Sequence, residues 1–239
     1  MFVNAATANA LDYIAERASD VYKAYTPGAR PSYGDVETER DAAVPVLDPL
    51  SVAPPADAYF VTAGERGRRS YTQNGTLAVA GGTVTAAGAP VLGVTAPGGA
   101  LAELHIDPVD LALGRATNVH VEADGSVAYM RSSVDPRSGA RESERVTIGR
   151  LALARFPAGT KLQSAGADRA VAPAGVLPHV GSPGDGNFAP VAPLHREQSR
   201  VNLDESLNRL EDAYLAFDAL AAAHKAQGSL GKTAMDLLK

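Results

Sequence analysis

The chain has 239 residues, enough for one or two domains. Apolar residues make up 45% of it, but 45 residues are alanine, only 5% are aromatic and tryptophan is absent. Large apolar side chains supply most of the hydrophobic drive, at roughly 25 cal/mol for each Å² buried. We therefore expect an elongated body, or one that completes its core with neighbouring subunits, and not a globule around one thick core.

Charge and residue types argue against several classes of protein. The 22 basic and 27 acidic residues give a net charge of −5, so we expect no nucleic-acid partner. The absence of cysteine excludes disulfides and cysteine-ligated zinc. No apolar run is long enough to cross a bilayer, so we expect no membrane insertion. Residues 1–10 lack a basic region and a long apolar stretch, and we expect no cleaved signal peptide.

The N-terminal segment, residues 1–26, has the pattern of a helix that ends before Pro27-Gly28. Its apolar residues are spaced by three and four, as one stripe requires: Leu11, Ile14, Ala18, Val21 and Tyr25. Residues 27–57 are rich in proline, alanine and acids, which predicts an extended linker.

Residues 58–170 change to the period of two that β-strands need, with frequent turn residues. Gly81-Gly82 predicts a hairpin of strands 77–80 and 83–86, and Asp124-Gly125 is expected to do the same between 119–121 and 127–129. We expect further strands at 145–148 and 150–156, and a short helix at 108–113. Residues 171–194 are again rich in proline and glycine and predict a connection.

The C-terminal segment, residues 195–239, carries the clearest helix pattern. Asn202 suits the N-cap, Glu205 can complete a capping box, and Gly228 is expected to end or weaken the helix. A spacing of 3.5 residues, typical of a coiled-coil seam, joins Leu203, Leu207, Leu210, Tyr214, Phe217, Ala221 and His224. An amphipathic helix packed on its own domain explains the pattern equally well, and both interpretations stay open.

These segments together predict an α+β fold. An antiparallel β-rich central domain carries N- and C-terminal helices, which we expect to pair as an α-helical coiled-coil layer. A lone helix with a narrow apolar stripe is marginal in water. The terminal helices are therefore expected to pair with each other or with the same helices of neighbouring subunits.

The search for catalytic chemistry gives little. The five histidines are scattered, no metal-binding spacing and no nucleophile motif occurs, and we expect neither a cofactor nor an enzyme. The densest basic cluster is Glu65-Arg66-Gly67-Arg68-Arg69. A solvated hairpin tip explains this cluster more simply than a phosphate site.

Three stretches, residues 59–61 with 71–77, residues 87–93 and residues 197–203, carry short motifs that in their order resemble those of the bacterial flagellar basal-body rod and hook family. Residues 59–61 and 71–77 are similar to the family's "FF.V…YTR.G.F" stretch, and residues 87–93 to its "DG.PVLG". Residues 197–203 are similar to the "E.SNVDL" that opens the C-terminal helix, whereas the N-terminal motif is absent as such. The positions that carry the resemblance most directly are Tyr71, Thr72, Gly75, Gly88, Glu197, Ser199, Val201 and Asn202.

The resemblance implies a structural subunit of the rod, which transmits torque from motor to hook. The expected partners are other rod subunits and further copies of itself in a helical assembly, after passage through the flagellar type III export apparatus without a cleavable signal. The implied location is the periplasmic part of the basal body. The expected subunit interface consists of Leu11, Ile14, Val21, Leu203, Leu207, Leu210, Tyr214 and Phe217. The alternative function is a β-rich carbohydrate- or cell-wall-binding module with helical ends.

Overall fold

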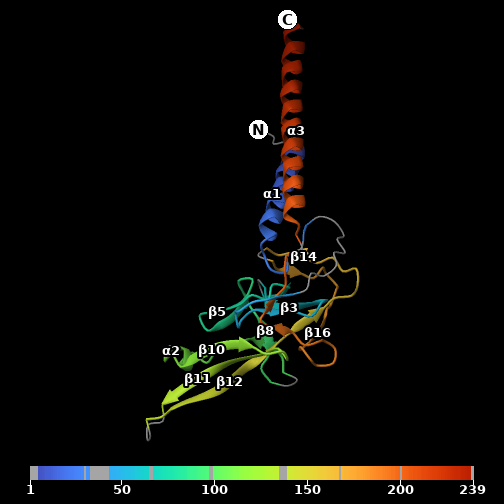
Figure 1. Cartoon of the computed structure of the whole chain (residues 1–239). Helices are drawn as coiled ribbons and strands as arrows, with labels where there is room; N and C mark the ends of the chain where they lie inside the picture. Colours follow the sequence, from blue (N-terminus) through green and yellow to red (C-terminus); the bar gives the residue numbers. More distant parts are fainter. Residues whose placement is uncertain are drawn as a thin grey trace. The chain divides into compact units, whose positions relative to one another are not determined.

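The computed structural model has a mixed α+β fold, with antiparallel sheets between an N-terminal and a C-terminal helix (Figure 1). It describes residues 5–29, 31–32, 43–64, 67–96, 99–134, 139–166, 168–199 and 201–237. The chain divides into two compact units. The helical unit is drawn from residues 1–25, 30–37 and 199–239, and the β unit from residues 26–29 and 38–198. Residues 1–4 of the expected N-terminal helix lie outside the described residues.

Two larger sheets form the body of the β unit. The six-stranded sheet has the order β14 (Gln163–Ser164), β15 (Ala170–Val171), β4 (Arg69–Thr72), β3 (Ala58–Ala63), β13 (Leu153–Arg155), β16 (His179–Gly181). The five-stranded sheet has the order β10 (Ala116–Val121), β11 (Ser126–Val134), β12 (Arg141–Leu151), β8 (Leu92–Val94), β9 (Leu101–Glu103). The short helix α2 (Pro108–Ala112) precedes β10, where a helix at 108–113 was predicted.

Smaller sheets complete the β unit. The three-stranded sheet consists of β5 (Leu77–Ala80), β6 (Thr83–Ala86) and β7 (Ala89–Pro90). Two further pairs join β1 (Val44–Pro45) to β18 (His195–Arg196), and β2 (Val52–Ala53) to β17 (Ala192–Pro193). These pairs tie the segment just before β3 to the segment just before the C-terminal helix.

The core of the β unit lies on both faces of the six-stranded sheet. Successive residues of β3 point to opposite faces, as the pleat requires. Phe60 enters a large cluster with Leu104, Leu151 and Phe188, and Val61 enters a second cluster that contains Tyr71. The central strand is therefore apolar at consecutive positions because both of its faces are covered.

The two predicted hairpins are present, but their turns differ. Gly81 and Gly82 both adopt positive φ angles, 58° and 85°, as a two-residue primed turn needs. The turn of the second hairpin spans four residues, Glu122 to Gly125, and among these only Gly125 has a positive φ. The expectation that Asp124 shares the role of a glycine is therefore wrong. Its side chain instead accepts hydrogen bonds from the backbone N–H and hydroxyl of Ser126.

The strand predicted at 145–148 begins earlier than expected. β12 starts at Arg141, pairs with β11 along most of its length, and runs through Gly149 to Leu151. A bulge lies where Val127 and Ala128 face Gly149 and Thr147. Period-two reasoning missed the first four residues because they are charged or polar and exposed, as is common on a strand with an open edge.

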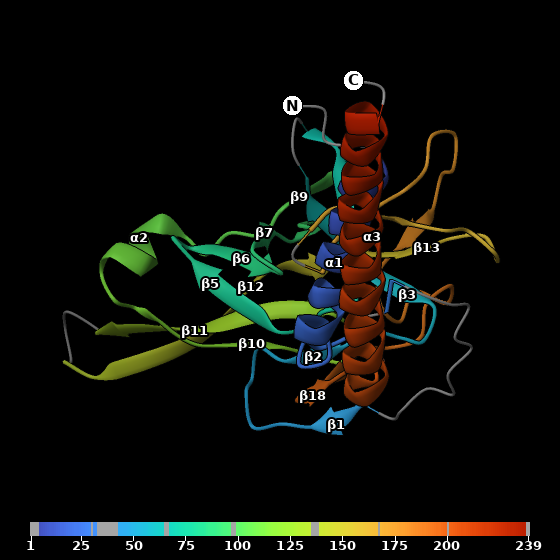
Figure 2. The ribbon, with the colours of Figure 1, turned by 90° about the horizontal axis from the view of Figure 1, so that it is seen from above.

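The helical unit pairs two antiparallel helices (Figures 1 and 2). α1 (Ala5–Lys23) lies beside the N-terminal part of α3 (Leu203–Leu237), and the hydroxyl of Ser199 donates to the carbonyl of Lys23 where the two meet. Asn202 caps α3, because its Oδ1 accepts from the backbone N–H of Glu205. The carboxylate of Glu205 binds Arg209. α3 does not end at Gly228 and continues to Leu237.

Candidate interaction surfaces

The interior of the helical unit is unusually polar. Asp20 is completely buried and accepts hydrogen bonds from the side chains of Arg17 and Lys23 and from both the backbone and the hydroxyl of Ser32. Arg17 is also buried, and its guanidinium lies over the ring of Tyr13 and contacts Glu16. This network fastens the segment after α1 back onto the helix.

α3 presents mostly small or half-buried side chains on its more buried face. Ser206 and Ala213 are buried, and they lie seven residues apart on one face. Their small volume allows close approach of a neighbouring helix, at the expense of buried apolar area. The half-buried residues on the same side are Leu203, Arg209, Leu210, Phe217, Leu220 and His224.

The structure divides the predicted interface residues between two environments. Ile14 is buried and Val21 is half-buried on α1, and Leu203, Leu210 and Phe217 are half-buried on α3. Leu11, Leu207 and Tyr214 are exposed. The heptad pattern thus joined residues that face inward to residues that lie on the neighbouring, solvent-exposed side.

Apolar side chains form an exposed stripe on α1. We call Leu11, Ala15, Ala18 and Tyr22 the outer stripe of α1, because spacings of 4, 3 and 4 place them on one side. Leu11 is 50% exposed and Tyr22 is 79% exposed. Tyr25, in the turn after the helix, is exposed as well.

A second exposed stripe on α3 combines apolar and acidic groups. We call Leu207, Glu211, Tyr214 and Asp218 the outer stripe of α3, and Leu215 lies beside it. Leu207 is 45% and Tyr214 52% exposed, and these residues line a shallow groove of about 380 Å³. Neither carboxylate has a basic partner within the described part of the chain.

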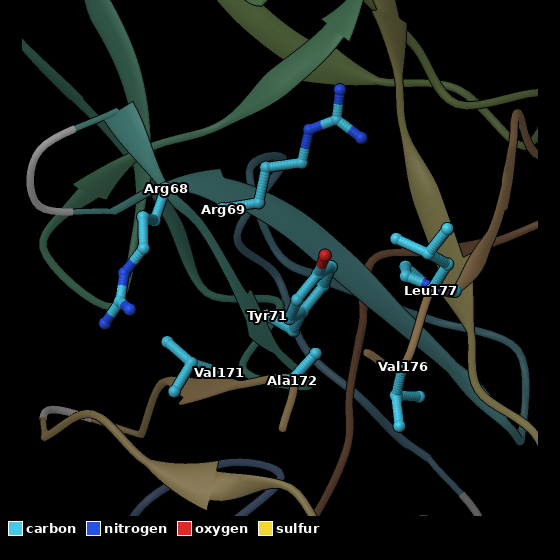
Figure 3. A pocket seen from close by; sticks show the side chains of 8 residues that line it. Arg68, Arg69, Tyr71, Val171, Ala172, Val176 and Leu177 are labelled. Carbon is cyan, nitrogen blue, oxygen red and sulfur yellow. The ribbon is translucent and has the colours of Figure 1, made fainter. Parts of the chain in front are cut away.

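The β unit has a separate hollow beside β4, of about 310 Å³ (Figure 3). Its apolar lining includes Tyr71, Val171, Val176 and Leu177. The side chains of Arg68 and Arg69 flank it and point away from each other (Figure 3). We call this the basic hollow. Burial raises the pKa of the Tyr71 hydroxyl, although the charge of Arg69 opposes the rise, so the tyrosine stays neutral.

A cluster of polar side chains, two of them buried, links α2 to β11 of the five-stranded sheet. The carboxylate of Asp110 accepts from the hydroxyl of Tyr129 and from Nε of Arg131, both at 2.6 Å. These two hydrogen bonds, with the charge of Arg131, hold the pKa of Asp110 below its usual value. Burial and the Asp110 carboxylate raise the pKa of Tyr129. All three groups are satisfied by one another, which indicates a structural role.

Four of the residues that carry the family resemblance lie on or near β4 and β6 of the β unit. Tyr71 and Thr72 belong to β4, and both are buried. A Cβ atom on Gly75 would lie 1.6 Å from the carbonyl oxygen of Val52, so only glycine fits there. Gly88 has a φ of 72° in the turn between β6 and β7.

The remaining motif residues directly precede α3 in the chain. The carbonyl of Glu197 accepts from the backbone N–H of Gly28. Ser199 Oγ donates to the carbonyl of Lys23 and accepts from the backbone N–H of Val201, which is buried. Asn202 is the cap already described. Arg200, within the same motif, lies outside the described residues, as do Glu65 and Arg66 of the basic cluster.

Sequence reasoning missed the Asp20 network and the basic hollow. Arg17 and Asp20 are ordinary helix charges in the sequence, and only the fold brings Ser32 to them. The basic hollow joins β4 to residues 171–178, about a hundred positions apart, which no local pattern connects. Arg68 and Arg69 were the only signal for the hollow.

Within the described ranges, no three histidine or acidic side chains gather closely enough to hold a metal ion. Among the described helices, none is long and apolar enough to span a membrane.

Comparison with known proteins does not assign the chain to a family. No protein-family model matches the chain, and a search of curated proteins finds no match.

Proposed function

We propose that the chain is a structural subunit of a bacterial flagellar basal-body rod, and that it assembles through its terminal helices. One observation carries the proposal. Within the described helical unit, buried positions are largely polar or small, such as Arg17, Asp20 and Ser206, whereas large apolar side chains such as Tyr22 and Tyr214 are exposed. A helix pair that leaves its large apolar groups in water gains stability when a neighbour covers them.

The ordered motifs support the choice of the rod and hook family over other helical assemblies. Their residues occupy positions where the fold restricts the side chain, such as Gly75 against β2 and Asn202 at the start of α3. The family architecture places terminal helices in an inner tube and a β-rich domain outside it. A chain with a helix at each end and antiparallel sheets between them fits this architecture.

The proposal includes partners and a location. In the assembly, α1 and α3 pack as a coiled-coil layer with other copies and with other rod subunits, and the subunit transmits torque by these contacts. It reaches the periplasmic rod through the flagellar type III export apparatus. It performs no catalysis and needs no cofactor, nucleic acid or membrane insertion for this role.

Isolated basal bodies test the proposal. We expect deletion of the gene to leave basal bodies without a complete rod and cells without motility, and the wild-type chain to restore both. Leu210→Asp introduces a charge on the half-buried side of α3 and should abolish assembly while the β unit still folds. Normal rods and motility in the deletion strain would overturn the proposed function.

The wall-binding alternative needs exposed aromatic side chains in the β unit. Phe60, Tyr71 and Tyr129 are buried there, and Tyr59 and Phe156 are half-buried against each other. This burial favours the structural role. Retention of the full chain on peptidoglycan through residues 58–170 would favour the alternative.

A further inference from the structure

We propose that the basic hollow of the β unit binds the outer stripe of α3 from a second copy of this chain. The inference rests on the proposed function, because it names the surfaces through which copies associate. It adds a contact between unlike surfaces to the helix–helix packing proposed above.

The first argument is charge. Arg68 and Arg69 flank the hollow, and within the described ranges no carboxylate lies at ion-pair distance from either guanidinium. Glu211 and Asp218 on the outer stripe of α3 likewise have no basic partner among the described side chains. Arginine binds carboxylates through two parallel hydrogen bonds, so these groups are chemically complementary.

The second argument is the apolar surface between the charges. Leu177 on the rim of the hollow is 85% exposed, and Val176 and Tyr71 line its floor. Tyr214 and Leu215 are exposed between the two acids of α3. A volume of about 310 Å³ is at the lower end of small-molecule sites and suits one or two inserted side chains.

The third argument is spacing. Glu211 and Asp218 are seven residues apart, which separates their Cα atoms by about 10 Å along the helix axis, with Tyr214 between them. Arg68 and Arg69 project in different directions from the edge of the hollow (Figure 3). One helix laid across the hollow can therefore offer an acid to each arginine while its aromatic ring covers the apolar floor.

The contact joins two different surfaces, so each copy uses its hollow on one neighbour and its α3 on another. Such a heterologous contact produces an open helical filament when its rotation does not close a ring. This is the kind of assembly that a rod requires.

Cysteine cross-linking tests the contact, because the chain has no cysteine of its own. Full-length Leu177→Cys and Leu215→Cys chains, which both keep the ring of Tyr214, are oxidised separately and as a mixture. We expect a disulfide between the two kinds of chain in the mixture, at a yield at least about fivefold above either chain alone, since each single variant lacks the second sulfur of the contact.

Charge reversal adds a specific control. Arg68→Glu/Arg69→Glu in one partner, or Glu211→Arg/Asp218→Arg in the other, should lower the mixed yield at least about tenfold, since like charges then face each other. Combining the two reversals should restore the yield. Arg141→Glu/Arg196→Glu changes the net charge equally at exposed positions outside the hollow and should have no effect.

The outcomes separate this inference from the proposed function. Chains that assemble without the mixed cross-link would overturn the inference and leave the rod proposal standing. Chains that do not associate at any concentration would overturn both. Binding of peptidoglycan fragments that Arg68→Glu/Arg69→Glu abolishes, with no mixed cross-link, would assign the hollow to a wall ligand and contradict the inference.

Discussion

At the scale of single residues, buried charges have large effects on stability, because each depends on a few hydrogen-bond partners. Asp110 is nearly inaccessible, and its carboxylate accepts from Tyr129 and Arg131. Because the pKa of Asp110 is lowered in the folded chain, the unfolded chain takes up a proton at this residue at a higher pH than the folded chain does. The carboxylate therefore stabilises the fold above the usual pKa of aspartate, and this stability is lost as the pH falls through the folded pKa.

We expect Asp110→Asn to lower the melting temperature of the β unit at neutral pH. The difference from the wild-type chain should shrink as the pH falls below about 3.9, the usual pKa of aspartate, because the wild-type carboxylate then becomes protonated too. Thermal unfolding followed by circular dichroism at a series of pH values measures the difference. A gap of constant size across that series would contradict the assigned role.

Asp20 is the corresponding residue of the helical unit. Asp20→Ala removes the buried one of the two acidic partners of Arg17 and releases Ser32, so we expect a loss of roughly 3–5 kcal/mol in the free energy of unfolding of this unit. Asp12→Ala, on the exposed side of the same helix, should change it by less than about 0.5 kcal/mol. Equal melting curves for the two variants, recorded on the helical signal, would show that the network contributes no stability.

At the scale of elements, local chemistry predicted some features well. The Gly81-Gly82 turn and the Asn202 cap each depend on a few neighbouring residues, so sequence alone located them. Which side of α3 is buried depends on where α1 packs, so the spacing of apolar residues alone could not predict it. Ser206 and Ala213 are buried although neither is a large apolar residue, while Leu207 and Tyr214 are exposed.

The candidate surfaces follow the same division. The predicted interface named Leu11 and Tyr214, which are exposed and available, together with Ile14, which the isolated chain already buries. The outer stripes were therefore partly predicted. Which side of α3 stays exposed depends on the distant helix α1, and the basic hollow joins β4 to residues 171–178, so periodicity alone reveals neither surface.

The thin apolar interior of the helical unit has a dynamic consequence. Few buried apolar groups hold α1 to α3, so in the free chain we expect their amide hydrogens to exchange much faster than those of β3 and β13, which pass through the core. Assembly should slow exchange in both helices at least about tenfold, because neighbours then cover the outer stripes. Hydrogen–deuterium exchange of the free and assembled chain measures this. Helices as protected as β3 in the free chain would contradict the account.

At the scale of the whole molecule, the composition has a physical explanation. The large apolar residues are concentrated in the β unit, where Phe60, Leu104 and Tyr129 are completely buried or nearly so. The helical unit leaves a large share of its own large apolar residues exposed. The chain therefore contains one finished core and one surface that, in the proposed function, further copies complete.

The central claim is that further copies cover the outer stripes, and sedimentation velocity over a range of concentrations tests it most directly. Leu11→Ser/Tyr22→Ser removes the large apolar groups of the α1 stripe, each worth roughly 1.5–3 kcal/mol when fully buried, so association should weaken at least about tenfold. The matched control, Leu47→Ser/Val109→Ser, removes exposed apolar groups from the β unit and should assemble normally. The account predicts that the wild-type and control chains form larger species as concentration rises, while the stripe variant stays monomeric with an unchanged β unit. A wild-type chain that remains monomeric at every concentration, or a stripe variant that assembles as well as the control, would contradict it.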